Sequence, residues 1–299
     1  MQAQQTGLRS TQKAALVSGC STGFGHAIVR ELAKLGYRVY AGLRRLTDAA
    51  AFPVELRDVV PIQLDVTDAT QVRAAVAAIR GDVGALDVLV NNAGIDIPGA
   101  LEDLPEKYLR EVMEVNFFGA LALTRAALPL LRSRPQSAVV MISSLSGLVG
   151  LPGSGAYCAS KFALEGATES LRHEVARFGV RVALIEPGGY DTAMATKRKL
   201  PPDYPATSPY LPLVESLISA SSAGPGRDPS DIAEFVARLI ASNSTQLRHP
   251  AGRQAEQLFE RLRTMDDGAR QAFVREAFGT GWWEDGQRSP PAAGARDGD

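Results

Sequence analysis

Cysteine and histidine are both scarce in this sequence. Among 299 residues there are two cysteines, Cys20 and Cys158, and three histidines. Two cysteines are too few for a disulfide framework or a cysteine zinc site, and this low number is typical of proteins from a reducing compartment. The histidines His26, His173 and His249 share no ligand spacing, so no metal site is predicted.

Long hydrophobic runs and an excess of either charge are also missing. No run of eighteen apolar residues occurs, and the first thirteen residues lack the apolar core of a signal peptide. These two absences predict a cytoplasmic protein without a membrane span. The 32 Lys and Arg balance the 33 Asp and Glu, leaving a formal net charge of −1. No overall field therefore attracts nucleic acid, and a small molecule is the expected partner.

Short apolar runs alternate with longer segments in which apolar residues recur every three or four positions. The runs predict strands buried on both faces, and the longer segments predict crossover helices. The sequence therefore predicts an α/β fold, a single doubly wound (Rossmann) parallel sheet flanked by helices, within one domain over residues 12–285. Strands are expected at 14–18, 38–43, 59–64, 88–90, 138–142, 181–185 and 247–249, and helices at 25–35, 68–80, 106–132, 157–178 and 231–241.

Two further segments differ from this pattern. Residues 189–228 are rich in Pro, Ser and Gly and predict a substrate flap with one short helix at 213–219. Residues 254–285 predict a helical C-terminal extension, whose aromatic residues cover the substrate cleft, a partner subunit or the protein's own core. Residues 1–11 and 286–299 have no apolar anchor and are predicted to be disordered.

A glycine-rich loop follows the first expected strand. In SGCSTGFG, the glycines Gly19, Gly23 and Gly25 lie between a strand and a helix. Glycine permits a tight turn and the close approach of a pyrophosphate, to which the helix offers unpaired N–H groups. This context favours a dinucleotide site over a simple turn. The loop residues expected to contact the cofactor are Gly19, Ser21, Thr22, Gly23, Phe24 and Gly25.

The end of the second expected strand bears on the choice of cofactor. NAD sites usually carry an acidic residue there, whereas this chain has Leu43 followed by Arg44 and Arg45. An arginine complements the 2′-phosphate of NADP. NADP(H) is therefore predicted to be preferred, with NAD(H) possible; the alternative is a solvated basic loop.

Three more features point to the carboxyl edge of the sheet or to proton transfer. Asp65 follows one strand end and NNAG follows another, although Asp65 is alternatively a cap for the helix that begins near Asp68. Tyr157 and Lys161 are four residues apart, so they share a helix face. A lysine ammonium favours a phenolate and brings a tyrosine towards working pH, although such pairs are also common on ordinary helices.

Taken together, these motifs form a known set. SGCSTGFG, NNAG, EVNFFG, ISSLSG, YCASK and EPGGYDT occur in this order over residues 14–252. The sequence resembles the short-chain dehydrogenase/reductase family, and SLRHEVARFGVRVALIEPGGYDT is most similar to its hydroxysteroid, retinol and hydroxybutyrate dehydrogenase branches. The resemblance implies hydride transfer between NADP(H) and the carbonyl or secondary alcohol of a lipophilic substrate. The alternatives are an NAD-dependent alcohol dehydrogenase of the same fold and a non-catalytic dinucleotide-binding regulator.

The resemblance also implies roles for single residues. Tyr157 exchanges a proton with the substrate oxygen, Ser144 binds that oxygen, Lys161 binds the nicotinamide ribose and lowers the pKa of Tyr157, and Asn116 kinks its helix to hold a water. Further cofactor contacts are expected from Asp65, Val66, Asn92, Ala93, Gly94, Pro187, Gly188, Tyr190 and Thr192.

Some positions leave alternatives open. Tyr190 either leans on the nicotinamide or fills the base of the flap, and Cys158 is either a redox switch or an inert buried thiol. Family members pair through the helices at 106–132 and 157–178, so a homodimer or homotetramer is expected. The apolar stripe of Leu164, Ala167, Leu171 and Val175 either forms that seam or faces the sheet.

Overall fold

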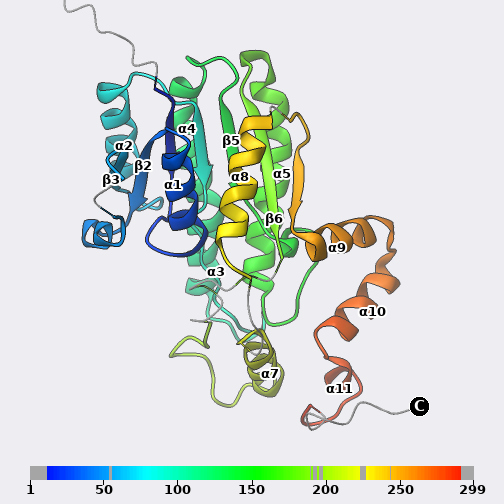
Figure 1. The fold of residues 1–299 in the computed structure, drawn as a ribbon. Coiled ribbons are helices and arrows are strands. Elements are labelled where there is room, and N and C mark those ends of the chain that lie inside the picture. The colour runs from blue at the N-terminus through cyan, green and yellow to red at the C-terminus, as the bar shows by residue number, and fades with distance from the viewer. Residues whose placement is uncertain are drawn as a thin grey trace, which may run out of the picture.

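One parallel sheet organises the protein. The computed structural model describes residues 12–53, 56–188, 190, 194, 198–222, 227–242 and 244–290. Within these residues, seven strands run in the order β3-β2-β1-β4-β5-β6-β7, and every neighbouring pair is parallel (Figure 1). The strands are β1 Ala14–Val17, β2 Arg38–Leu43, β3 Val59–Gln63, β4 Val88–Asn91, β5 Ala138–Ile142, β6 Arg181–Pro187 and β7 Arg248–Ala251.

Helices cover both faces of this sheet, as predicted for a doubly wound fold. Side chains alternate along a strand, so Leu16 of β1 packs into one core with α2, α4 and α5, while Val17 packs into the other with α1 and α8. Burial of a leucine such as Leu16 stabilises the fold by about 1.5–3 kcal/mol. The helices are α1 Gly23–Lys34, α2 Ala69–Asp82, α3 Glu106–Met113, α4 Ala120–Leu131, α5 Gly155–Val175, α7 Leu211–Ser222, α8 Ser230–Ser242, α9 Arg253–Thr264, α10 Asp267–Ala277 and α11 Gly281–Glu284.

The strand order creates a switch point beside β1. After β1, β2 and β3 extend the sheet one way, and the chain then returns to place β4 against the other side of β1. The crevice outside the carboxyl ends of such strands is where open α/β sheets bind ligands. The segment 18–25 and the NNAG turn both begin at this crevice.

The described part of the flap is docked onto the body of the protein. Four of its residues bond to the segment 100–108: Asp203 to Lys107 and Tyr108, Tyr204 to the N–H of Ala100, Ser208 to Asp103, and Tyr210 to Glu102. The helix α7 then lies directly on Gly153, where an added Cβ would meet Leu217 at 3.3 Å.

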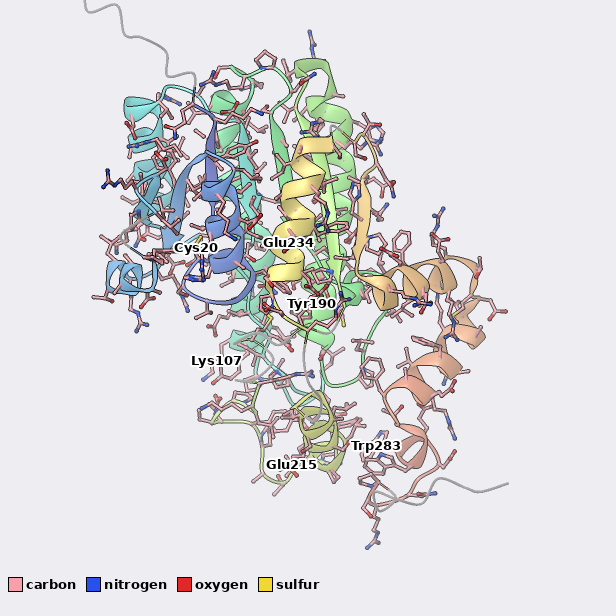
Figure 2. The ribbon with its side chains drawn as sticks, in the orientation of Figure 1. Cys20, Lys107, Tyr190, Glu215, Glu234 and Trp283 are labelled. Carbon is pink, nitrogen blue, oxygen red and sulfur yellow. The ribbon has the colours of Figure 1, made fainter. Side chains whose placement is uncertain are left out.

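The C-terminal extension packs on the flap helix. From β7, α9 and α10 run along one side of the molecule and α11 returns to α7 (Figure 1). Trp282 is buried against Leu213 and Leu217, and the ring centroids of Trp283 and Tyr210 are 5.9 Å apart. Figure 2 shows Trp283 beside α7, on which Glu215 is labelled. The extension thus packs on the flap helix, in a cluster separate from the two cores that flank the sheet, and the choice between cleft, partner subunit and core stays a prediction.

One helical segment among the described residues is long and apolar enough to cross a membrane by length and composition. It is Glu106–Leu131, with a mean hydropathy of 1.2 over its best window. Its apolar side packs against the sheet through Leu123, Ala127 and Leu131, as in the core helix of a folded domain. The expected absence of a membrane span stays a prediction, as do the domain limits 12–285. Residues 1–11 and 291–299 of the expected tails lie outside the described residues.

Candidate active site

The glycine loop is shaped by its contact with the NNAG turn. Gly19 and Gly23 have φ values of +69° and +60°, a region that favours glycine. A Cβ on Gly19 would lie 2.8 Å from the Cα of Ala93. The Asn92 side chain donates hydrogen bonds to the carbonyls of Ser18 and Gly19 at 2.9 and 3.0 Å. The side chain of Asn92 therefore braces the loop.

The start of α1 fits a pyrophosphate. Its N-cap residue, Thr22, makes no side-chain cap, and the first turn carries no acidic residue. Ser21 is half-buried and Thr22 is exposed. The first N–H groups of the helix thus have no side-chain partner among the described residues, which leaves them and the positive helix end for an anion.

Only one of the two arginines after β2 is free among the described residues. Arg45 forms an ion pair with Asp48 at 3.1 Å, whereas Arg44 is exposed and pairs with no described residue. Leu43 is fully buried, so the position at which an acidic residue was expected faces the core instead. Arg44 is the side chain that is available to a 2′-phosphate.

Asp65 and Val66 occupy the end of the next strand. The helix α2 is capped by Asp68, whose carboxylate accepts from the N–H groups of Thr70 and Gln71. The alternative that Asp65 caps this helix is therefore wrong. Asp65 instead accepts hydrogen bonds from the N–H and hydroxyl of Thr67. Val66 is buried, with its side chain against Gly119, so its expected contact with the cofactor stays a prediction.

Asn116 lies in the distorted part of the helical segment Glu106–Leu131. Residues Glu114–Gly119 form a π-helical turn, which is the distortion that the resemblance led us to expect. The Asn116 side chain bonds to both backbone groups of Ile95, at 2.8 and 2.9 Å, and donates to the Ser160 hydroxyl at 2.9 Å. It therefore links the NNAG turn to α5.

Tyr157 and Lys161 project from α5 towards the end of β5. The Lys161 ammonium donates to the Ile142 carbonyl at 2.9 Å and lies 5.5 Å from the centre of the Tyr157 ring. Burial lowers the pKa of Lys161 to about 8. The hydroxyl of Ser144 accepts from the N–H of Ser146 and lies close enough to Tyr157 to lower its pKa.

Lys161 is not among the groups that set the pKa of Tyr157 in this structure, so its expected effect on that pKa stays a prediction. Burial, followed by the charge of Asp96, raises the pKa of the Tyr157 phenol above its ordinary value, and Ser144 and Arg198 lower it only in part. The phenol is therefore protonated at neutral pH, the state of a proton donor.

An ion pair beside the site was missed by sequence reasoning. Arg198 of the flap lies 3.1 Å from Asp96, and both side chains are mostly buried. Arg198 also donates to the hydroxyl of Ser154, three residues before Tyr157. No sequence signal connects two charges about a hundred residues apart, although the carboxylate of Asp96, two residues after NNAG, was a visible departure from the apolar surroundings.

Tyr190 fills the base of the flap. Its ring is buried, packs edge-on against Phe24 at 5.3 Å, and carries the Arg227 guanidinium 5.1 Å above its centre. Of the two expectations for Tyr190, the structure supports packing. Pro187 and Gly188 lead from β6 into this region, and Thr192 lies outside the described residues.

Three other expectations can be placed in the structure. Cys158 is buried, accepts a hydrogen bond from the Leu151 N–H at 3.3 Å and has a pKa raised by burial, so its thiol is protonated and inert. In the part of the chain that is described, no group of three or more His, Cys, Asp or Glu is placed to hold a metal.

Leu164 and Val175 are buried in the core with Leu171 against them, so the apolar stripe of α5 faces the sheet.

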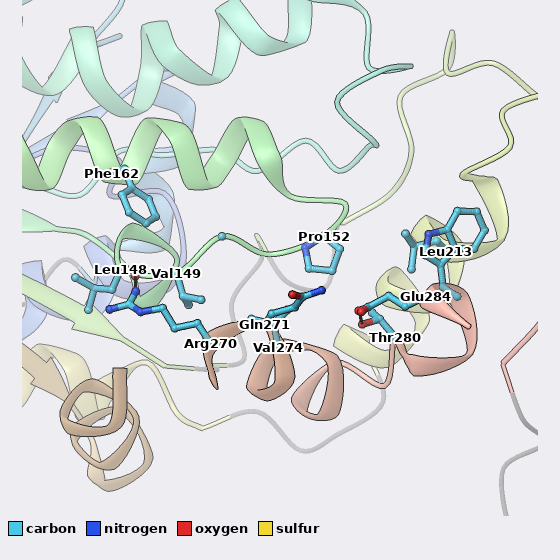
Figure 3. Close-up of a pocket in the computed structure, with 12 residues that line it drawn as sticks. Leu148, Val149, Pro152, Phe162, Leu213, Arg270, Gln271, Val274, Thr280 and Glu284 are labelled. Carbon is cyan, nitrogen blue, oxygen red and sulfur yellow. Dashed lines mark hydrogen bonds between the residues drawn. The ribbon is translucent and has the colours of Figure 1, made fainter. Parts of the chain in front are cut away.

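A cavity of about 410 Å³ lies under the C-terminal extension (Figure 3). One wall is the loop after Ser144, and Arg270 of α10 donates to the Leu148 carbonyl across it at 3.0 Å. Tyr157, Ser144 and Lys161 do not line it. The lining residues are Leu148, Val149, Gly150, Pro152, Phe162, Leu213, Arg270, Gln271, Val274, Thr280, Trp283 and Glu284.

Comparison with known proteins identifies the family of this chain. The family model described as short chain dehydrogenase matches residues 13–202. The chain belongs to the short-chain dehydrogenase/reductase family. It is 33% identical to human retinol dehydrogenase 8 over 90% of each chain, and 32% identical to the 3-ketodihydrosphingosine reductase of Bacteroides thetaiotaomicron over 83% of this chain and 91% of that one. A short-chain dehydrogenase of Burkholderia cenocepacia, solved in complex with NADP, is 28% identical with a TM-score of 0.69, over 90% of this chain and 98% of that one.

Proposed function

We propose that this short-chain dehydrogenase transfers hydride between NADP(H) and the carbonyl or secondary alcohol of a lipophilic substrate, as a ketoreductase-type enzyme. The observation that carries the proposal is a protonated, half-buried Tyr157 beside Ser144 and Lys161 at the switch point of the sheet. The names of two relatives, a retinol dehydrogenase and a 3-ketodihydrosphingosine reductase, support a lipophilic substrate.

Each residue of the site would have its own role in such a reaction. When bound, the nicotinamide supplies or accepts the hydride. Tyr157 donates a proton to the carbonyl oxygen, or accepts one from the alcohol, and Ser144 holds that oxygen by a hydrogen bond that strengthens as charge develops. The ammonium of Lys161 binds the ribose and stabilises the tyrosinate. Asn116 fixes the helix turn that links Lys161's helix to the cofactor edge.

The assay for this function is direct. Purified protein with NADPH and a series of lipophilic ketones and aldehydes is expected to show loss of absorbance at 340 nm. If NADPH binds but no carbonyl compound is reduced and no alcohol is oxidised, the protein is a dinucleotide-binding regulator instead.

Arg44 is expected to set the cofactor preference. A charge-assisted hydrogen bond to the 2′-phosphate is worth about 1.5–3 kcal/mol, so Arg44→Ala should lower the ratio of kcat/KM for NADPH to that for NADH by about 10- to 100-fold. Arg45 is occupied by Asp48, so Arg45→Ala is the matched control and should change the ratio much less. The preference should also weaken at high salt, because Arg44 is exposed. Equal efficiency with both cofactors in the unmutated enzyme at low salt contradicts the assignment.

The pair of Asp96 and Arg198 is expected to hold the flap closed. Removal of one partner from a buried pair typically costs about 3–5 kcal/mol, and these side chains are only 12% and 14% exposed. Arg198→Met should therefore loosen the flap and increase the rate of thermolysin cleavage within residues 198–222 several-fold. The double variant with Asp96→Asn leaves no lone charge and should regain much of the protection. Cleavage rates that are the same in the wild type and in Arg198→Met rule out this role.

Assembly and location complete the proposal. We place the protein in the cytoplasm as a homodimer or homotetramer. Family members pair through the helical segments 106–132 and 157–178. Because the apolar stripe of α5 faces the sheet, the contact between subunits would use the outward faces of these two segments, where Phe118 and Phe162 are 48% and 46% exposed. Light scattering on the purified protein measures the assembly, and a monomer at micromolar concentration contradicts it.

A further inference from the structure

Two buried glutamates lie behind Lys161, and the mechanism above uses neither of them. Glu165 of α5 is 4% exposed, and Glu186 of β6 is 0% exposed. A buried carboxylate is costly unless charged or polar groups compensate it. The pair therefore has either a structural or an electrostatic role.

The geometry of α5 places Glu165 next to the active site. Tyr157, Lys161 and Glu165 are spaced four residues apart and share one helix face. This face meets consecutive residues at the end of β5: Lys161 bonds to Ile142, Glu165 lies beside Ser143, and Tyr157 lies beside Ser144.

The turn after Ser144 packs against Glu165, Ser143 and the backbone of Lys161 through Gly147. A Cβ on Gly147 would lie 3.0 Å from Cγ of Glu165, 3.1 Å from Oγ of Ser143 and 3.2 Å from the carbonyl of Lys161. The Glu165 side chain is therefore held against the same turn that positions Ser144.

The partners of the two glutamates come from β7. Arg248 donates to Glu165 and to Glu169, each at 2.9 Å, and the N–H of His249 donates to Glu186 at 2.8 Å. The second carboxyl oxygen of both Glu165 and Glu186 is buried with no hydrogen-bond partner in the described part of the chain. Because Arg248 is shared with exposed Glu169, it does not fully neutralise Glu165.

The charges around Lys161 support an electrostatic role. Burial lowers the pKa of Lys161 to about 8, and the charge of Glu165 acts in the opposite direction by raising this pKa. Burial, and then the charge of Glu165, raises the pKa of Glu186 to about 8, so Glu186 is neutral below that pH. Asp96 and Arg198 face Tyr157 from the other side and act on its phenol.

We propose that Glu165 and Glu186 form a buried carboxyl pair that holds one negative charge behind Lys161 and keeps its ammonium group charged at working pH. Glu165 is then a positioning residue, which acts through Lys161 rather than on the substrate. The proposal rests on the proposed function only for the role of Lys161 in the reaction.

The direct test measures the protonation of Lys161 without cofactor or substrate. Competitive labelling with acetic anhydride at graded pH, read by mass spectrometry of the peptide that contains Lys161, gives the midpoint of its titration. In the wild type we expect a midpoint near 8. In Glu165→Gln, loss of a neighbouring opposite charge should lower it by about one pH unit or more, and the double variant with Glu186→Gln should lower it further, because Glu186 can no longer take over the charge.

Two variants on the same helix separate this role from a structural one. Glu169→Gln removes the other, exposed carboxylate partner of Arg248 and should shift the Lys161 midpoint much less than Glu165→Gln does, because it changes the charge behind Lys161 only through Arg248. Glu165→Asp keeps the negative charge, so its Lys161 midpoint should lie close to that of the wild type. An unchanged midpoint in Glu165→Gln, or equal shifts in Glu165→Gln and Glu169→Gln, overturns the proposal.

A reciprocal measurement covers the case in which Glu165→Gln does not fold. Burial raises the pKa of Glu165, and the charge of Lys161 is one of the groups that offset this in part. Lys161→Met should therefore raise the Glu165 midpoint further, as followed by carbon-13 NMR of the glutamate carboxyls. A Glu165 midpoint that is the same in the wild type and in Lys161→Met overturns the proposal.

The affinity for NADPH supplies a second readout, by quenching of tryptophan fluorescence. In Glu165→Gln, the fall of affinity with rising pH should begin about one pH unit lower than in the wild type. If the Lys161 midpoint shifts but NADPH binding does not change in this way, the proposed carboxyl pair is supported and the proposed role of Lys161 in binding the cofactor is wrong.

Discussion

Replacement of Tyr157 by phenylalanine is expected to lower turnover by about 10²- to 10⁴-fold, the usual contribution of a general acid. Tyr157 is half-buried, its phenol is protonated at neutral pH, and its ring is retained in phenylalanine. The variant should therefore keep its melting temperature and its affinity for NADPH while losing the proton donor. Measurement of kcat with the best carbonyl substrate, beside thermal unfolding and NADPH binding, separates these effects.

The pH dependence gives the same prediction a second check. The pKa of Tyr157 is raised, so carbonyl reduction, which needs the phenol, should hold its rate through neutral pH and fall only as the phenol ionises. Alcohol oxidation needs the phenolate and should become faster as pH rises. Both dependences should disappear in Tyr157→Phe. Turnover close to that of the wild type, at any pH, excludes Tyr157 as the proton donor.

The sheet and its helices could be predicted because each is determined by a local pattern. The strand β1 is apolar at every position, since it is covered on both faces, and the predicted and observed limits of β2 are identical. The last strand was expected at 247–249 and runs over Arg248–Ala251, because its short sequence RHPA has little apolar content to mark its ends.

The candidate catalytic residues were also accessible from sequence, because the resemblance to a family assigned their roles, while the spacing of Tyr157 and Lys161 predicted a shared helix face. What sequence could not supply are contacts between segments without such spacing. Arg198 reaches Asp96 from the flap, and Arg248 reaches Glu165 from β7, in each case through a side chain whose partner is set by the closing of the fold. The pKa of Tyr157 shows the same limit, because burial, which outweighs the neighbouring charges in raising it, depends on the packed structure.

The glycine loop offers the second large effect. In Gly25→Ala, the new Cβ would lie 2.4 Å from both the Gly19 carbonyl oxygen and the side-chain nitrogen of Asn92. A backbone oxygen cannot move aside without reshaping the loop, and overpacking of this kind costs about 1–3 kcal/mol of stability. If two charge-assisted bonds to the pyrophosphate are lost with the loop geometry, NADPH affinity should fall by about 10²- to 10⁴-fold.

Gly81 provides the matched control for this substitution. It lies in α2, where an added Cβ meets nothing within 4 Å, so Gly81→Ala should be neutral or stabilise the helix by about 0.5–1 kcal/mol. Both variants are compared by thermal unfolding and by titration with NADPH. Since the contact of Gly25 is with backbone and with the brace of Asn92, its effect should fall more heavily on binding than on stability. If Gly25→Ala binds NADPH as tightly as Gly81→Ala does, the close packing of this loop is not what shapes the cofactor site.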